Sequence, residues 1–151
     1  MNDQPAGSTR PRSKTIATWL AVLGGVLGAH RFYLRGRADP WAWAHVLVAL
    51  VGAVGVMRMR RLGQDDQLAW LLAPLLGVVV TAAMLAALII GLMPDEKWAN
   101  RFQPPQVVKP TGWAVILGVI AALLLGSTAL MSTLAFSGQK FFEYMAQLPP
   151  G

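Results

Sequence analysis

The composition of this chain is typical of a membrane protein. It has 151 residues, of which 55% are hydrophobic and 13% charged, whereas soluble domains carry about 25% charged residues. It contains no cysteine, which excludes disulfide frameworks, thiolate metal sites and thiol nucleophiles. The formal net charge is +6, and the basic residues gather at the edges of apolar segments. Anionic lipid headgroups are therefore the expected partner, and nucleic acid is not.

Four apolar segments predict an all-α integral membrane bundle with four transmembrane helices. The segments cover residues 15–34, 41–59, 68–93 and 113–136, and each is close to or above the ~20 residues that a helix needs to cross ~30 Å of hydrocarbon. The last two carry no charge. The first is uncharged only from 15 to 29, and the second contains His45, so these two depend on side chains that reach the headgroups from their ends.

Cap and turn residues separate the segments. Asp39 supplies an N-cap acceptor, and Pro40 stands at a first helical position, where proline is favoured. We therefore expect residues 34–41 to form a tight turn that joins the first two spans into a hairpin. Pro74 lies inside the third segment and should kink that helix. The third and fourth spans are joined by an expected Pro-rich interfacial loop over residues 94–110.

The expected organisation has a tail at each end of the bundle. Trp98 and Phe102 are expected on the lipid side of a short interfacial helix within the loop. The parts are a mobile basic N-terminal tail (1–14), a two-helix hairpin (15–60), the third and fourth spans with their loop (61–137), and an interfacial C-terminal tail (138–151).

Sidedness is nearly balanced in the four-span arrangement. Seven Lys or Arg residues lie on the side of the N-terminus and six on the other, so the total does not decide the orientation. The basic cluster before the first span favours a cytoplasmic N-terminus, and the Arg-rich, Ala-rich composition favours the inner membrane of a bacterium. The alternative is a cleaved secretory signal ending at Ala29; the large Leu27 two residues earlier argues against cleavage there.

One motif carries a family resemblance. The segment that starts at Gly25 and ends at Leu34 reads Gly-Val-Leu-Gly-Ala-His-Arg-Phe-Tyr-Leu. It resembles the hallmark of the TM-2 (two-transmembrane-helix) domain family, and the likeness covers about residues 14–60. The resemblance implies a helix that leads through a short turn to a second helix. Arg35 stands where the family usually has glycine, and the resemblance implies no reaction.

Two further sets of residues have candidate roles: the residues at the C-terminal end of the first span, and small residues spaced four apart. His30 and Arg31 form either a cation or proton site or, as we expect, an interfacial anchor in which Arg31 meets phosphate and Tyr33 marks the boundary. The anchor motif comprises Gly25, Gly28, His30, Arg31, Phe32, Tyr33 and Leu34. Small residues four apart allow close helix approach, within the chain or between chains. The helix-packing candidates are Gly24, Gly28, Ala82, Ala86, Ala122 and Gly126.

No reaction is indicated by the residues. The apolar spans carry no acidic side chain, and coupled transport usually needs a carboxylate there. We expect no catalytic residues, no metal site and no cofactor. The leading hypothesis is a non-enzymatic membrane scaffold or interaction protein that binds a second copy or another membrane protein through small-residue helix faces. The alternatives are an oligomeric channel or small transporter and, third, an intramembrane enzyme.

Overall fold

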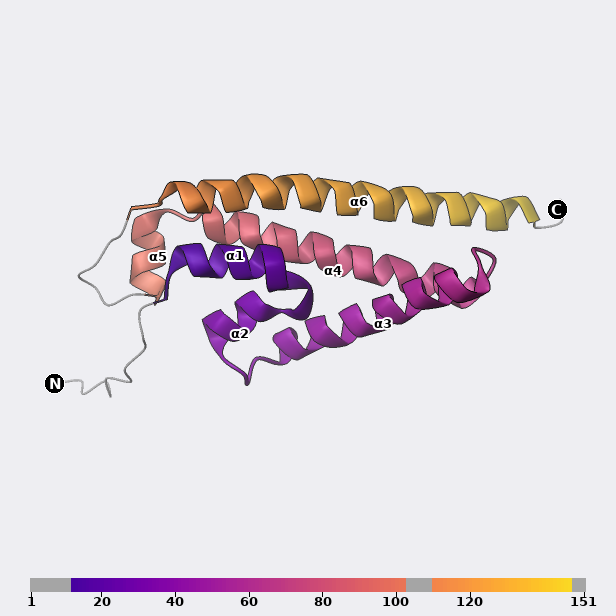
Figure 1. Ribbon diagram of the computed structural model, residues 1–151, viewed down its shortest axis with the longest axis horizontal. Coiled ribbons are helices and arrows are strands. Elements are labelled where there is room, and N and C mark those ends of the chain that lie inside the picture. Colours follow the sequence, from indigo (N-terminus) through magenta and orange to yellow (C-terminus); the bar gives the residue numbers. More distant parts are fainter. Residues whose placement is uncertain (1–11, 103–109, 148–151) are drawn as a thin grey trace.

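The computed structural model describes residues 12–102 and 110–147 (Figure 1). Residues 1–11 of the predicted N-terminal tail, 103–109 of the Pro-rich loop and 148–151 of the C-terminal tail lie outside the described residues. Every regular element of the described part is a helix, which confirms the all-α class. The elements are α1 (Lys14–Gly24), the 3₁₀ helix η1 (Gly25–Leu27), α2 (Ala29–Arg35), α3 (Pro40–Leu62), α4 (Gln67–Gly91), α5 (Asp95–Phe102) and α6 (Trp113–Gln147).

Three of the described helices are long and apolar enough to cross a membrane. They are α3, α4 and α6, with 23, 25 and 35 residues. At roughly 1.5 Å per residue each exceeds the ~30 Å thickness of the hydrocarbon core. These helices correspond to the second, third and fourth apolar segments of the sequence.

The first apolar segment is not the single helix that the sequence predicted over residues 15–34. α1 and η1 together cover only Lys14–Leu27, which is roughly 21 Å of helix and too short to cross the core. The chain then breaks at Gly28, whose φ of 68° is left-handed, and α2 begins at the next residue. The prediction failed because the glycines that suggested close helix packing instead end the helix.

α1 and α2 form a hairpin that returns to the end of the bundle where it started (Figure 1). The backbone N–H of Ser13, just before α1, donates to the Tyr33 hydroxyl in the last turn of α2 at 2.9 Å. We call this end, where α5 and the connection from α2 to α3 also lie, the entry end. The opposite end holds the α3–α4 turn at residues 63–66 and is called the turn end.

α4 is the central helix of the bundle. It packs against α3 on one side and α6 on the other, and α1 lies against both α4 and α6 in the entry half. The expected cap of α3 is confirmed, because the Asp39 side chain accepts from the Trp41 N–H and Pro40 is the first helical residue. Pro74 lies within α4 without ending it.

α6 runs the full length of the bundle and includes residues 138–147, which the sequence assigned to an interfacial tail. Lys140 and Glu143 form an ion pair at 2.7 Å, one turn apart, and Gln139 donates to Glu143 at 2.8 Å. These pairs favour continuation of the helix. The Lys140 ammonium lies 4.8 Å from the centre of the Trp70 ring, so the last turns of α6 lie beside the start of α4.

Candidate functional site

The break between η1 and α2 is the most unusual local structure of the bundle. The N–H of Gly28 donates to the Gly25 carbonyl at 2.9 Å, and the Gly28 carbonyl accepts from the N–H groups of Arg31 and Phe32 at the start of α2. A Cβ at Gly28 would lie 3.1 Å from the Ala42 carbonyl oxygen. Glycine is therefore required here both for the left-handed backbone and for the close approach of α3.

Two imidazoles lie beside this break. His30 is 4% exposed, and its ring centre is 6.2 Å from that of His45 on α3, with the ring planes at 86°. Nδ1 of His30 and Nε2 of His45 are buried and have no hydrogen-bond partner among the described residues. Such atoms are uncommon in protein interiors. His30 was predicted at the headgroup interface, whereas the structure places it inside the bundle.

The rest of the predicted anchor motif also has protein partners. Arg31 pairs through Nε with Asp39 at 3.0 Å, and the Asp39 side chain is 5% exposed. Phe32 packs edge-on against the Trp43 ring at 5.4 Å. Tyr33 and Leu34 pack against the apolar core, and the Leu34 carbonyl accepts from the Arg12 guanidinium. The motif thus closes the hairpin onto α3 and α1, while its predicted contact with lipid stays a prediction.

A buried ammonium joins four segments at the entry end. Lys14 is 9% exposed and donates to the Met93 carbonyl at 2.6 Å, to Asp95 Oδ1 at 2.9 Å and to Thr111 Oγ1 at 2.7 Å. The second oxygen of Asp95 accepts from the Thr111 N–H at 2.8 Å. The hydrogen bonds from Thr111 and Lys14 lower the pKa of Asp95 to about 2. We call Lys14, Asp95 and Thr111 the entry clasp.

The clasp was not predicted from the sequence, where Lys14 belongs to the expected mobile tail. The available signal was that Lys14 precedes one uncharged segment and Asp95 follows another, which places both at span ends. Proximity in sequence could not pair them, since α1 and α5 are separated by the rest of the hairpin, α3 and α4. A lysine with three acceptors is stable at such depth, whereas an unpaired one is not.

α5 confirms the predicted short helix but presents its tryptophan to the protein. Trp98 is 2% exposed, its indole N–H donates to the Arg12 carbonyl at 3.2 Å, and its ring centre is 4.4 Å from that of Phe102. The expectation that this aromatic pair lies on lipid is wrong for Trp98. The physical reason is that the N-terminal end of α1 offers the indole both apolar contact and an acceptor.

The small residues singled out from the sequence fall into two groups. Ala122 is fully buried, and a Cβ at Gly126 would lie 2.8 Å from the Met84 Cβ. Within the chain, Gly24 is close to Ala29. On α4, by contrast, Ala82 is exposed and Ala86 half-buried, whereas the neighbouring Ala83 and Ala87 are fully buried. The closest α3–α4 contact uses glycines that sequence reasoning overlooked, Gly52 and Gly55, where a Cβ would collide with the α4 backbone.

Two kinds of candidate reactive group can be located in the described residues. No group of three or more His, Cys, Asp or Glu side chains in residues 12–102 and 110–147 is arranged to hold a metal ion. The hydroxyls of Ser127 and Thr128 donate to carbonyls one turn back in α6, as serine and threonine often do in membrane helices. Comparisons with protein-family models, with curated proteins and with solved structures find no match to this chain.

Proposed function

We propose that this is a non-enzymatic multi-pass membrane protein whose role is to associate with other membrane helices, as a scaffold or interaction protein. The observation that carries the proposal is the uncovered face of α4. The central helix packs against α1, α3 and α6, yet one side of it is exposed along the helix. That side bears the exposed small residue Ala82, whereas Ala86 is half-buried.

The uncovered face has the spacing of a helix-packing seam. Its exposed residues recur at alternating intervals of three and four, the pattern by which one helix presents a continuous stripe to another. Ala82 lies at the middle of the stripe, where a small side chain lets a second helix approach closely. The stripe, which we call the α4 seam, consists of Val78, Ala82, Leu85, Ile89 and Leu92.

Cysteine cross-linking in native membranes tests the α4 seam. The chain has no cysteine of its own, so Leu85→Cys introduces the only thiol. If a second copy docks here, oxidation gives a disulfide-linked dimer, and adding Ala82→Phe abolishes it. Leu124→Cys, at an exposed position of α6, is the matched control and should stay monomeric. Equal cross-linking at both positions contradicts the proposal. So does the absence of cross-linking at Leu85 if a pull-down from the same cells also finds no other membrane protein.

We further propose that three helices cross the membrane and that the α1–α2 hairpin enters and leaves on one side. This arrangement changes the charge comparison that the four-span arrangement left balanced. Among the described residues seven Lys or Arg lie at the entry end and four at the turn end, which favours a cytoplasmic entry end. The seven are Arg12, Lys14, Arg31, Arg35, Arg37, Lys97 and Arg101, and the four are Arg58, Arg60, Arg61 and Lys140.

Labelling from one side of the membrane separates the two topologies. Ser8→Cys and Ala38→Cys should both be protected from an impermeant maleimide added outside intact cells, and Gln64→Cys should react. A four-span chain would instead put Ser8 and Ala38 on opposite sides. That result would overturn the re-entrant hairpin while leaving the α4 seam untouched.

A second candidate function is a small transporter or channel, and the helix break favours it. Backbone that is not helical at membrane depth occurs where protein or a water-filled cavity surrounds it, and His30 with His45 lies beside this break. Purified protein in proteoliposomes would then carry a proton or cation flux that His30→Gln removes. Absence of flux under every applied gradient excludes this candidate. The TM-2 resemblance over residues 14–60 and a bacterial inner-membrane location stay predictions.

A further inference from the structure

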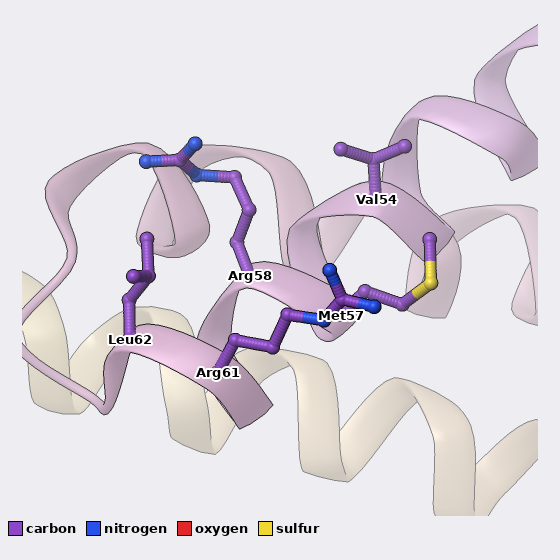
Figure 2. Close-up of a pocket in the computed structure, with 5 residues that line it drawn as sticks. All are labelled: Val54, Met57, Arg58, Arg61 and Leu62. Atoms are coloured by element: carbon purple, nitrogen blue, oxygen red, sulfur yellow. The ribbon is translucent and has the colours of Figure 1, made fainter.

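We infer that the turn end of α3 carries a binding site for one anionic phospholipid. A hollow of about 330 Å³ lies there, lined by Val54, Met57, Arg58, Arg61 and Leu62 (Figure 2). Its lining combines two guanidinium groups with three apolar side chains. A phosphate ester that carries acyl chains has both complementary parts, a charge for the arginines and hydrocarbon for the valine and methionine.

The two arginines differ in how they are held. Arg58 donates from Nε and Nη2 to the two carboxylate oxygens of Asp66, at 2.8 and 3.0 Å, which fixes its guanidinium and leaves Nη1 without a partner among the described residues. This pairing lowers the pKa of Asp66, so the carboxylate stays charged at neutral pH. Arg58 therefore contributes an oriented donor, with little net charge of its own.

Arg61 supplies the uncompensated charge. It is exposed, and none of the ion pairs within the described residues involves it. Figure 2 shows its side chain running back along α3 toward Met57. A phosphate placed beside both guanidinium groups would receive charge-assisted hydrogen bonds from Arg61 and from the free nitrogen of Arg58.

Two of the three apolar lining residues precede the arginines in α3. Val54 and Met57 precede Arg58 and Arg61 in the helix and are 45% and 52% exposed. They belong to the span, whereas the arginines stand just before the turn at residues 63–66. A lipid with its phosphate at the arginines would thus lay an acyl chain along Val54 and Met57 in the natural direction. A free phosphate ion would leave this wall unused.

Native mass spectrometry of the detergent-purified protein tests the site. Phosphatidylglycerol, phosphatidylcholine and inorganic phosphate are titrated separately into the wild type, Arg61→Gln and the matched control Arg60→Gln. Arg60 is the adjacent exposed arginine and does not line the hollow. We expect one tight phosphatidylglycerol, with affinity reduced about fivefold or more by Arg61→Gln and unchanged by Arg60→Gln. Val54→Ser, which leaves every charge in place, should also weaken it.

Three outcomes would overturn the inference. Equal weakening in the Arg60 and Arg61 variants would mean that the lipid responds only to total charge. Equal binding of phosphatidylcholine would mean that no anionic group is recognised. Displacement of phosphatidylglycerol by millimolar inorganic phosphate would mean that the acyl wall adds nothing. None of these results bears on cross-linking at the α4 seam, so the two proposals fail independently.

Discussion

The two halves of this bundle are stabilised by different means. In the entry half, the α1–α2 hairpin fills the space beside α4 and α6. The buried residues there include one apolar cluster that contains Trp98, and the Lys14 side chain is also buried. In the turn half no such filler is present among the described residues. There α3 and α4 meet through Gly52 and Gly55, and Gly77 of α4 faces Thr133 of α6.

The comparison shows what the short hairpin adds to a bundle of three long apolar helices. Long helices in lipid gain nothing from hiding apolar side chains from one another, because lipid is as apolar as leucine. The turn half therefore relies on close backbone approach. The hairpin brings buried polar groups into the entry half, including His30 and Thr18, whose hydroxyl donates to the Lys14 carbonyl. Substitutions in the two halves should consequently differ in their effects.

The largest effect is expected for Lys14→Met. It removes the three hydrogen bonds that the ammonium donates and leaves Asp95 with Thr111 alone. Breaking a buried ion pair from one side costs about 3 kcal/mol or more. The thermal midpoint in detergent should fall sharply, whereas the control Lys97→Met, at an exposed position of α5, should leave it unchanged. Similar small effects for both would show that the clasp is not what holds the entry half.

A smaller loss is expected for Gly28→Ala at the helix break. A left-handed residue with a Cβ costs about 1–2 kcal/mol, and here the Cβ would also approach the Ala42 carbonyl oxygen at 3.1 Å. A loss clearly above this backbone cost measures the packing of the hairpin on α3. Unfolding in detergent measures it, and Gly138→Ala, where nothing lies within 4 Å of the Cβ position, is the control that should lose no stability. A loss no larger than the backbone cost would mean that only strain matters.

Gly52→Ala in the turn half should cost about 1–3 kcal/mol. The added methyl group would collide with the backbone nitrogen of Leu76, so α3 and α4 must move apart to admit it. The same substitution at Gly138 of α6, where nothing lies within 4 Å, is the control and should be neutral or slightly stabilising, because alanine is the better helix former. Unfolding in detergent measures both. A loss no larger than that of the control would mean that the close approach at Gly52 does not hold the turn half.

The smallest effect concerns acid. The pKa of Asp95 is lowered to about 2, chiefly by the Thr111 hydrogen bond and then by Lys14. A depressed carboxyl pKa means that the clasp contributes its full stability above about pH 4, the ordinary pKa of an unfolded aspartate, and loses it as the pH falls toward 2. The stability difference between wild type and Asp95→Asn should therefore shrink from pH 5 to pH 2. A constant difference over this range would contradict the assignment.

Much of the architecture could be predicted from local residues. Uncharged stretches of sufficient length gave α4 and α6, and Asp39 with Pro40 gave the start of α3 to the residue. The helix over 95–102 followed from Trp98 and Phe102, which stand four residues apart with charged residues on the other face. Each of these features depends on neighbours within a few turns of the chain, so no knowledge of the fold was needed.

The candidate site was harder to predict, because the burial and contacts of its residues depend on partners that are distant in sequence. In the sequence, Gly28 is one of several small residues that suggest a packing groove. Only the close approach of Ala42 and His45 shows that the helix breaks at Gly28 instead. His30 read as an interfacial side chain because Arg31 and Tyr33 follow it. Those two residues instead have partners in Asp39 and Ser13, which sequence spacing does not reveal.

By itself the sequence determined the all-α class and the positions of the three long apolar helices, since hydropathy and caps act over a single helix. The tertiary structure decided what the first apolar segment does, which small residues face outward and which charges share an end. Those outcomes depend on how the hairpin packs against α4. A left-handed glycine and a buried lysine are stable only when the surrounding helices supply the room and the acceptors.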